Sequence, residues 1–139
     1  MTAYRGPVFD MAVKQFEVIA DDLSISQDAR ARLLMPKRPV TVSYPTHRDG
    51  GTTAVFEGYR VPHHLTLGPT KGGARLAASV DLGEVAAPAI WMSWKCALVA
   101  LPYGGARGGL NVDPSRLPER ELEVLSRRYM RALPRGQDS

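Results

Sequence analysis

The stretch Leu101–Pro114, LPYGGARGGLNVDP, is the part of the sequence on which the interpretation of the whole chain depends. In it, four glycines and one alanine flank a single long cation, Arg107. Glycines on both sides of a charged residue let the backbone and a ligand approach closely. The stretch therefore predicts a pocket whose cation holds or polarises an anionic or carbonyl substrate. The alternative is a glycine-rich turn between a helix and a strand, with an arginine that points to water.

Length and composition predict one globular domain, because 139 residues that are 44% apolar and 23% charged can bury a sizeable core. Eighteen Lys and Arg against fourteen Asp and Glu give a net charge of +4, without a dense basic block. This mild excess permits anionic small-molecule substrates. Only the basic isoelectric point supports nucleic-acid binding, so we expect no nucleic-acid partner. The single cysteine, Cys96, excludes an internal disulfide. Without a secretion signal or a membrane span, we expect a cytoplasmic protein with no membrane partner.

The first half of the sequence begins with two helical patterns. Apolar residues recur every three or four positions within residues 1–25, which predicts an amphipathic helix. A second short helix follows, with Ser24 or Ser26 as its N-cap, and it ends before Pro36. The residues of the first helix that we expect to be buried are Phe9, Val13, Phe16, Ile19, Ala20 and Leu23.

A β-hairpin is predicted next, because the hydrophobic period changes to two at residue 40. Its strands cover residues 40–44 and 53–61, and the sequence Asp49-Gly50-Gly51 supplies the turn. Prolines at both ends of the first strand favour a position at the edge of a sheet.

The second half of the chain alternates glycine-rich segments with helices. The expected elements are a loop (67–76), a helix (81–101), a short strand (108–112), a last helix (118–133) and a disordered polar tail (134–139). Pro88 lies inside the longer helix and is expected to kink it.

Three cations lie in or near the two glycine-rich segments. Lys71 belongs to the first segment, while Lys95 precedes Arg107 by twelve residues, on the helix before the second segment. Their convergence on one cleft would suit a dicarboxylate or an amino acid, and the alternative is three unrelated surface cations. Lys95 stands in a very apolar segment, so we expect it to be partly buried.

No metal site and no nucleotide site is expected. His63 and His64 are adjacent, so on a strand their side chains would face opposite ways and could not chelate one metal. Zinc-type spacing and dinucleotide or nucleotide phosphate loops are missing from the sequence, so we expect this chain to bind neither metal nor cofactor. Trp91 and Trp94 are expected in the core.

Taken together, the motifs resemble the N-terminal domain of the Glu/Leu/Phe/Val dehydrogenase family, nearest to glutamate dehydrogenase. From about residue 30 to residue 133, they follow the family's order and spacing. The motifs are FEGYRV (56–61), GPTKGGAR (68–75), WKCALV (94–99), the stretch 101–114 and LSRRY (125–129). The resemblance implies an α/β fold over residues 1–139, with a single mixed sheet flanked by helices. It also implies a substrate-binding and oligomerisation domain whose edge strands help to build a hexamer.

The resemblance also assigns roles to individual residues. Lys71, with its neighbours Gly72 and Gly73, and Lys95 match the substrate-binding positions whose lysines hold the substrate carboxylates. Met92 matches a helix position that also faces the substrate.

Arg107 stands where the family has its catalytic lysine, which polarises the carbonyl and assists the water or ammonia step. A guanidinium stays protonated at physiological pH and offers no lone pair. We therefore expect Arg107 to hold an anion without transferring protons.

The sequence also departs from the family in other places. Pro62, His64 and Leu67 replace the usual Gln, Asn and Arg, and the 139 residues do not reach the downstream catalytic aspartate or the domain that binds NAD or NADP. Two hypotheses follow. The chain is a dehydrogenase N-terminal domain, inactive alone, that binds amino-acid or 2-oxo-acid carboxylates and forms homo-oligomers. Alternatively, it is a non-catalytic structural or regulatory subunit that assembles with a full-length dehydrogenase.

Overall fold

The computed structural model describes residues 4–133, so the expected tail at 134–139 lies outside the described residues. Its elements, in chain order, are α1 (Pro7–Asp22), α2 (Gln27–Leu34), β1 (Val40–His47), β2 (Thr53–Pro62), β3 (Thr70–Lys71), β4 (Ala74–Ala77), α3 (Leu82–Leu98), β5 (Gly104–Asn111), the 3-10 turn η1 (Pro114–Arg116) and α4 (Glu119–Ala132).

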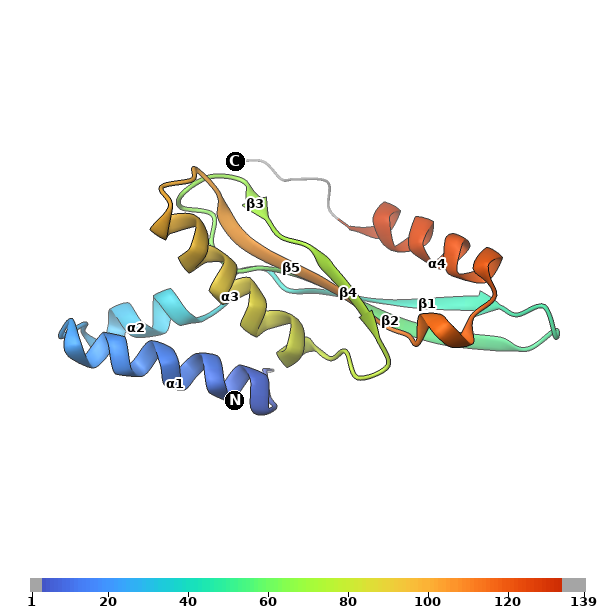
Figure 1. Cartoon of the computed structure of the whole chain (residues 1–139), viewed down its shortest axis with the longest axis horizontal. Helices are drawn as coiled ribbons and strands as arrows, with labels where there is room; N and C mark the ends of the chain where they lie inside the picture. The colour runs from blue at the N-terminus through green and yellow to red at the C-terminus, as the bar shows by residue number, and fades with distance from the viewer. Residues whose placement is uncertain (1–3, 134–139) are drawn as a thin grey trace.

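One mixed sheet organises the domain, as the resemblance implies (Figure 1). Its strand order is β1-β2-β5-β3, and β4 also pairs with β5. The β1–β2 and β2–β5 pairs are antiparallel, whereas β3 and β4 run parallel to β5. The glycine-rich strand β5 is therefore central, and β1 is an edge strand.

The central strand is in close contact with a helix on each face. A methyl group at Gly105 or Gly109 would overlap atoms of α3, and one at Gly108 would overlap the hydroxyl group of Tyr129 on α4. In Figure 1, α1 and α2 lie on the α3 side of the sheet, and α4 lies on the other side. The glycines are therefore what allows two helices to approach this strand so closely.

The prediction of a strand over residues 108–112 was wrong in its bounds, because β5 covers Gly104–Asn111 and includes the whole glycine cluster. Glycine clusters usually mark turns, but here close packing on both faces favours glycine within a strand. The loop predicted at 67–76 likewise contains β3 and β4. The helix predicted to end near residue 101 ends at Leu98, and Ala100 follows with φ 53°.

The hairpin is confirmed, but its first strand is longer than expected. β1 continues through Pro45, which pairs with Val55, to His47. An edge strand tolerates proline because the side facing away from β2 needs no N–H donor. The predicted edge position of this strand is therefore confirmed.

The helix boundaries follow capping signals. The Ser26 hydroxyl accepts a hydrogen bond from the Ala29 amide at 3.4 Å, and the Asp81 carboxylate accepts one from the Glu84 amide at 2.8 Å. α3 is continuous across Pro88. None of the described helices is long and apolar enough to cross a membrane.

Two hydrophobic clusters cover the two faces of the sheet. One joins α1, α2 and α3 to β2, and the other joins α4 to β1 and β5. α1 contributes Phe9, Phe16 and Ala20 to the first cluster. The predicted burial of Ile19 and Leu23 was wrong: these side chains are 55% and 67% exposed. They lie outside the narrow stripe with which α1 contacts α3.

Candidate functional site

Arg107 lies in β5, between the glycines on which α3 packs. Because side chains alternate along a strand, Arg107 leaves the sheet on the α3 face, as Gly105 and Gly109 do. The residue is half-buried, and Nη1 lies 3.4 Å from where a Cβ atom would stand at Gly73. The predicted alternative of a turn at this segment is therefore wrong, because the segment is a strand.

Lys71 lies on the same face of the sheet as Arg107. Its parallel partner on β5 is Gly105, and paired residues of neighbouring strands point to the same side. The side chain is exposed. Directly after it, a methyl group at Gly72 would overlap the carbonyl oxygen of Ala106, so glycine at this position lets the segment lie against β5.

Lys95 and Met92 share the outer side of α3, three residues apart. Lys95 is exposed and Met92 is half-buried, so the prediction of a partly buried Lys95 was wrong. The face of α3 that meets β5 contains Ser93, which is two residues, or about 200° of helix rotation, away from Lys95. The adjacent residues Trp94 and Cys96 therefore belong to other faces of the helix, whereas Trp91, Met92 and Leu98 share the side of Lys95.

The three candidate cations have no anionic partner within residues 4–133. The ion pairs of this part of the chain involve other arginines, on α2, in the β1–β2 turn, on η1 and on α4. Two of the cations, Lys71 and Arg107, share one sheet face, and the third stands on the helix that covers it. The structure therefore brings Lys71 and Arg107 to one face of the sheet, where they can accept a carboxylate, but it places Lys95 on the side of α3 turned away from β5.

A buried hydrogen-bond chain through His63 was missed from the sequence. His63 is 2% exposed; its Nε2 lies 2.9 Å from the Leu33 carbonyl oxygen and its Nδ1 lies 2.7 Å from Ser93 Oγ. Because a carbonyl only accepts, Nε2 carries the proton, and Nδ1 accepts from the Ser93 hydroxyl. Ser93 Oγ in turn accepts from the Gly105 amide at 2.9 Å.

The surroundings of His63 keep its imidazole neutral. Burial, with the charges of His64 and Lys37 as smaller causes, lowers the pKa of His63 to about 4. The two histidine rings lie 5.7 Å apart, centroid to centroid, because both residues follow the end of β2 and do not alternate across it. Within residues 4–133, no group of three or more His, Cys, Asp or Glu side chains is placed to hold a metal ion.

The sequence signal for this chain of hydrogen bonds was weak. A histidine directly after a strand and a serine on an apolar helix indicate burial only when each is known to face the core. Trp94 and Trp91 show the same difficulty. Trp94 stacks on Phe16 yet is only half-buried, and half-buried Trp91 donates from Nε1 to Gln15 Oε1 at 2.9 Å.

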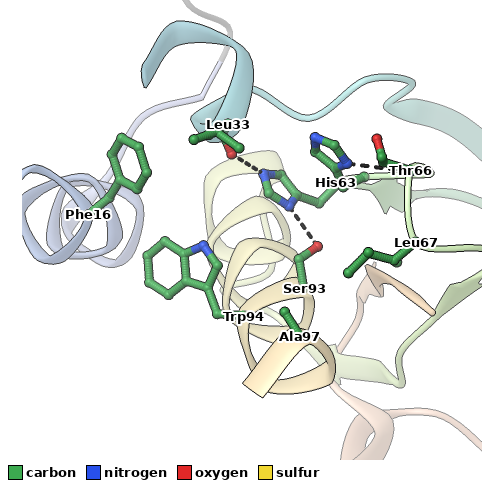
Figure 2. A pocket seen from close by; sticks show the side chains of 10 residues that line it. Phe16, Leu33, His63, Thr66, Leu67, Ser93, Trp94 and Ala97 are labelled. Atoms are coloured by element: carbon green, nitrogen blue, oxygen red, sulfur yellow. Dashed lines mark hydrogen bonds between the residues drawn. The ribbon is translucent and has the colours of Figure 1, made fainter. Parts of the chain in front are cut away.

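A cavity of about 380 Å³ adjoins His63, between α1, α2, α3 and the segment after β2 (Figure 2). Its walls are mainly apolar and include Phe16, Leu33, Leu67 and Trp94. This cavity is distinct from the three candidate cations, none of which lines it.

Comparison with known proteins identifies the family of this chain. Residues 36–138 match the family model described as the Glu/Leu/Phe/Val dehydrogenase dimerisation domain. The chain therefore belongs to this family, and its mixed sheet with flanking helices is the family's N-terminal domain.

Curated relatives are glutamate dehydrogenases. The chain is 46% identical over 122 residues to the glutamate dehydrogenase of Thermotoga maritima, a match that covers 88% of this chain and 29% of that protein. It is 44% identical over 128 residues to the NADP-specific glutamate dehydrogenase of Synechocystis, covering 92% and 30%. The chain therefore spans less than a third of the length of these relatives.

Solved structures give the same result. Glutamate dehydrogenase from Peptoniphilus asaccharolyticus superposes with a TM-score of 0.85 at 39% identity, covering 91% of this chain and 32% of that one. A hetero-hexameric glutamate dehydrogenase from Thermus thermophilus, in a Leu-bound form, superposes with a TM-score of 0.81 at 42% identity, covering 94% and 32%.

Proposed function

We propose that this chain binds the carboxylates of an amino acid or 2-oxo acid with Lys71, Lys95 and Arg107, as the N-terminal domain of a glutamate-type dehydrogenase. The observation that carries the proposal is the shared sheet face of Lys71 and Arg107, which have no ionic partner within residues 4–133. Met92, Gly72 and Gly73 complete the proposed pocket. Membership of a family whose named relatives are glutamate dehydrogenases supports this substrate class.

The chemistry of Arg107 limits the proposed role to binding. A guanidinium can hold a carboxylate through two parallel N–H donors. It cannot take up and release a proton at physiological pH, because it remains charged throughout this range. We therefore propose that Arg107 positions the substrate and that the chain alone does not catalyse the reaction.

We assign no nicotinamide-binding role to residues 4–133, because the sequence carries no dinucleotide phosphate loop. Relatives are named as NADP-specific and NAD-specific enzymes, and this cofactor would supply or accept the hydride in such a reaction. The proposed reaction steps of this chain are therefore binding and orientation of the acid.

Oligomer formation is the second part of the proposal. β1 exposes a strand edge, and such edges pair with other chains unless they are covered. The alternative function, a non-catalytic subunit beside a full-length dehydrogenase, is favoured by Arg107. The hetero-hexameric assembly of the Thermus thermophilus relative also favours it.

Calorimetric titration with glutamate and with 2-oxoglutarate tests the binding function. The wild-type chain should bind at least one of them saturably, and Lys95→Ala should weaken binding about tenfold, the effect of losing one charge-assisted contact. Lys14→Ala, which removes an exposed lysine from α1, is the matched control and should bind as the wild type does. Absence of heat for both acids with folded wild-type protein would leave only the oligomerisation role.

A further inference from the structure

The cavity beside His63 has the size of a small-molecule site and is open to solvent on one side. Its volume of about 380 Å³ falls within the range of roughly 300–1,000 Å³ that ligand pockets occupy. Its walls come from three helices and from the segment after β2, as Figure 2 shows. Because the lining residues Leu33, Leu67 and Ala97 are exposed, a compact molecule can enter the cavity from solvent.

One wall of the cavity is aromatic. The rings of Phe16 on α1 and Trp94 on α3 lie 6.2 Å apart, centroid to centroid, with their planes inclined by 19°. Both line the cavity, opposite Leu67 (Figure 2). Aromatic rings pair favourably with other rings in offset or edge-on contact, beyond the gain from buried area alone.

The floor of the cavity carries no charge. Among residues 4–133, no Lys, Arg, Asp or Glu lines it, and both nitrogens of His63 already have partners, Leu33 and Ser93. A charged ligand would lose its hydration there without gaining an ionic partner. The polar groups left at the rim are Thr66 and His64, which are neutral hydrogen-bonding residues.

We infer that this cavity binds an uncharged aromatic molecule of one or two fused rings, seated between the Phe16–Trp94 wall and Leu67. The site is separate from the proposed carboxylate site, because it lies among other residues and excludes the charged acids that Lys71, Lys95 and Arg107 would attract. It does not depend on the proposed function, and glutamate should not compete for it.

The probe for this site is indole, titrated by calorimetry against the whole chain. A fully seated ligand of this size should bind with a Kd on the order of 0.1 mM. Its charged analogue indole-3-carboxylate should bind at least tenfold more weakly, and saturating glutamate should leave the indole affinity unchanged. Equal binding of the two indoles, or no saturable binding of indole, would overturn the assignment.

Two matched substitutions locate the bound probe. Ala97→Phe fills the cavity from an exposed helix position, whereas Leu98→Phe adds a ring at the next residue, which is 86% exposed and does not line the cavity. We expect Ala97→Phe to weaken indole binding at least tenfold and Leu98→Phe to leave it within twofold. Full affinity in Ala97→Phe would contradict the site. So would an Ala97→Phe variant that alters only the oligomeric state, because the cavity would then be filled by a second copy of the chain.

Discussion

The hydroxyl group of Ser93 on α3 donates a hydrogen bond to Nδ1 of His63, the first residue after β2, at 2.7 Å. Through it, β5 and α2 are joined by one chain of hydrogen bonds, from the Gly105 amide to the Leu33 carbonyl group. The chain exists only while His63 is neutral, since a protonated imidazole has no lone pair with which to accept from Ser93.

Stability should therefore fall as His63 becomes protonated. Its pKa is about 4 in the folded protein against 6.5 unfolded, so the stabilisation is complete above about pH 6.5 and is lost as pH falls toward 4. The difference corresponds to about 3 kcal/mol in the free energy of unfolding. Urea denaturation from pH 7 to pH 4 measures it. His63→Gln should flatten the dependence of the unfolding free energy on pH in this range. His47→Asn, at an exposed histidine, is the control and should leave it unchanged. Equal pH dependence for the wild type and His63→Gln would contradict the role of His63.

Substitution of Gly72 should destabilise the fold strongly. A methyl group there overlaps the backbone carbonyl of Ala106, so β5 and the segment after β3 must separate. Gly72→Ala should cost about 2–4 kcal/mol in the free energy of unfolding. Gly50→Ala is the control, because a Cβ atom at this turn position meets nothing within 4 Å. Similar midpoints of urea unfolding for the two variants would show that the close approach is absent.

The free edge of β1 should make the chain self-associate. Thr41 and Ser43 are exposed on this strand, and lysine at both positions should oppose edge-to-edge pairing. Multi-angle light scattering should show an oligomer for the wild type and a smaller species for the double variant. Ser79→Lys, away from the edge, is the control. A wild-type chain that remains monomeric at high concentration would contradict the proposal that it forms oligomers.

Neither the wild-type chain nor Arg107→Lys should oxidise NADH or NADPH in the presence of 2-oxoglutarate and ammonia. Lysine restores a group whose pKa can be tuned, but hydride transfer also requires a cofactor held in position. Positioning of that kind contributes about 7–11 kcal/mol of barrier reduction. Turnover by either protein alone, followed at 340 nm in a standard spectrophotometric assay, would refute the proposal that this chain only binds.

Much of the fold follows from the sequence because hydrophobic period and caps are local signals. The amphipathic face of α4, with Leu125 and Tyr129 buried, and the hairpin with its edge strand are examples. The extent of β5 was not predictable, because glycines at 104–109 signal a turn until the helices on both faces are known. Local patterns cannot show that two helices approach one strand.

The candidate site, like the fold, was predictable from the sequence only in part. The motif around Arg107 was visible in the sequence, and the sheet register explains its relation to Lys71. The exposure of Lys95 was misjudged, because a run of apolar residues does not reveal which helix face each member occupies. The chain from His63 to Ser93 joins residues thirty positions apart, and no spacing rule connects them.

The most direct test of the central claim is the charge at residue 107 in a calorimetric titration with glutamate and 2-oxoglutarate. Arg107→Lys keeps a cation on the α3 face of β5 and should bind within a few-fold of the wild type. Arg107→Glu places a carboxylate there and should weaken binding at least a hundredfold, roughly 3 kcal/mol, through repulsion and a lost charge-assisted contact. Circular dichroism verifies that both variants are folded. Equal affinities for folded Arg107→Glu and wild type would contradict a carboxylate site built around Arg107.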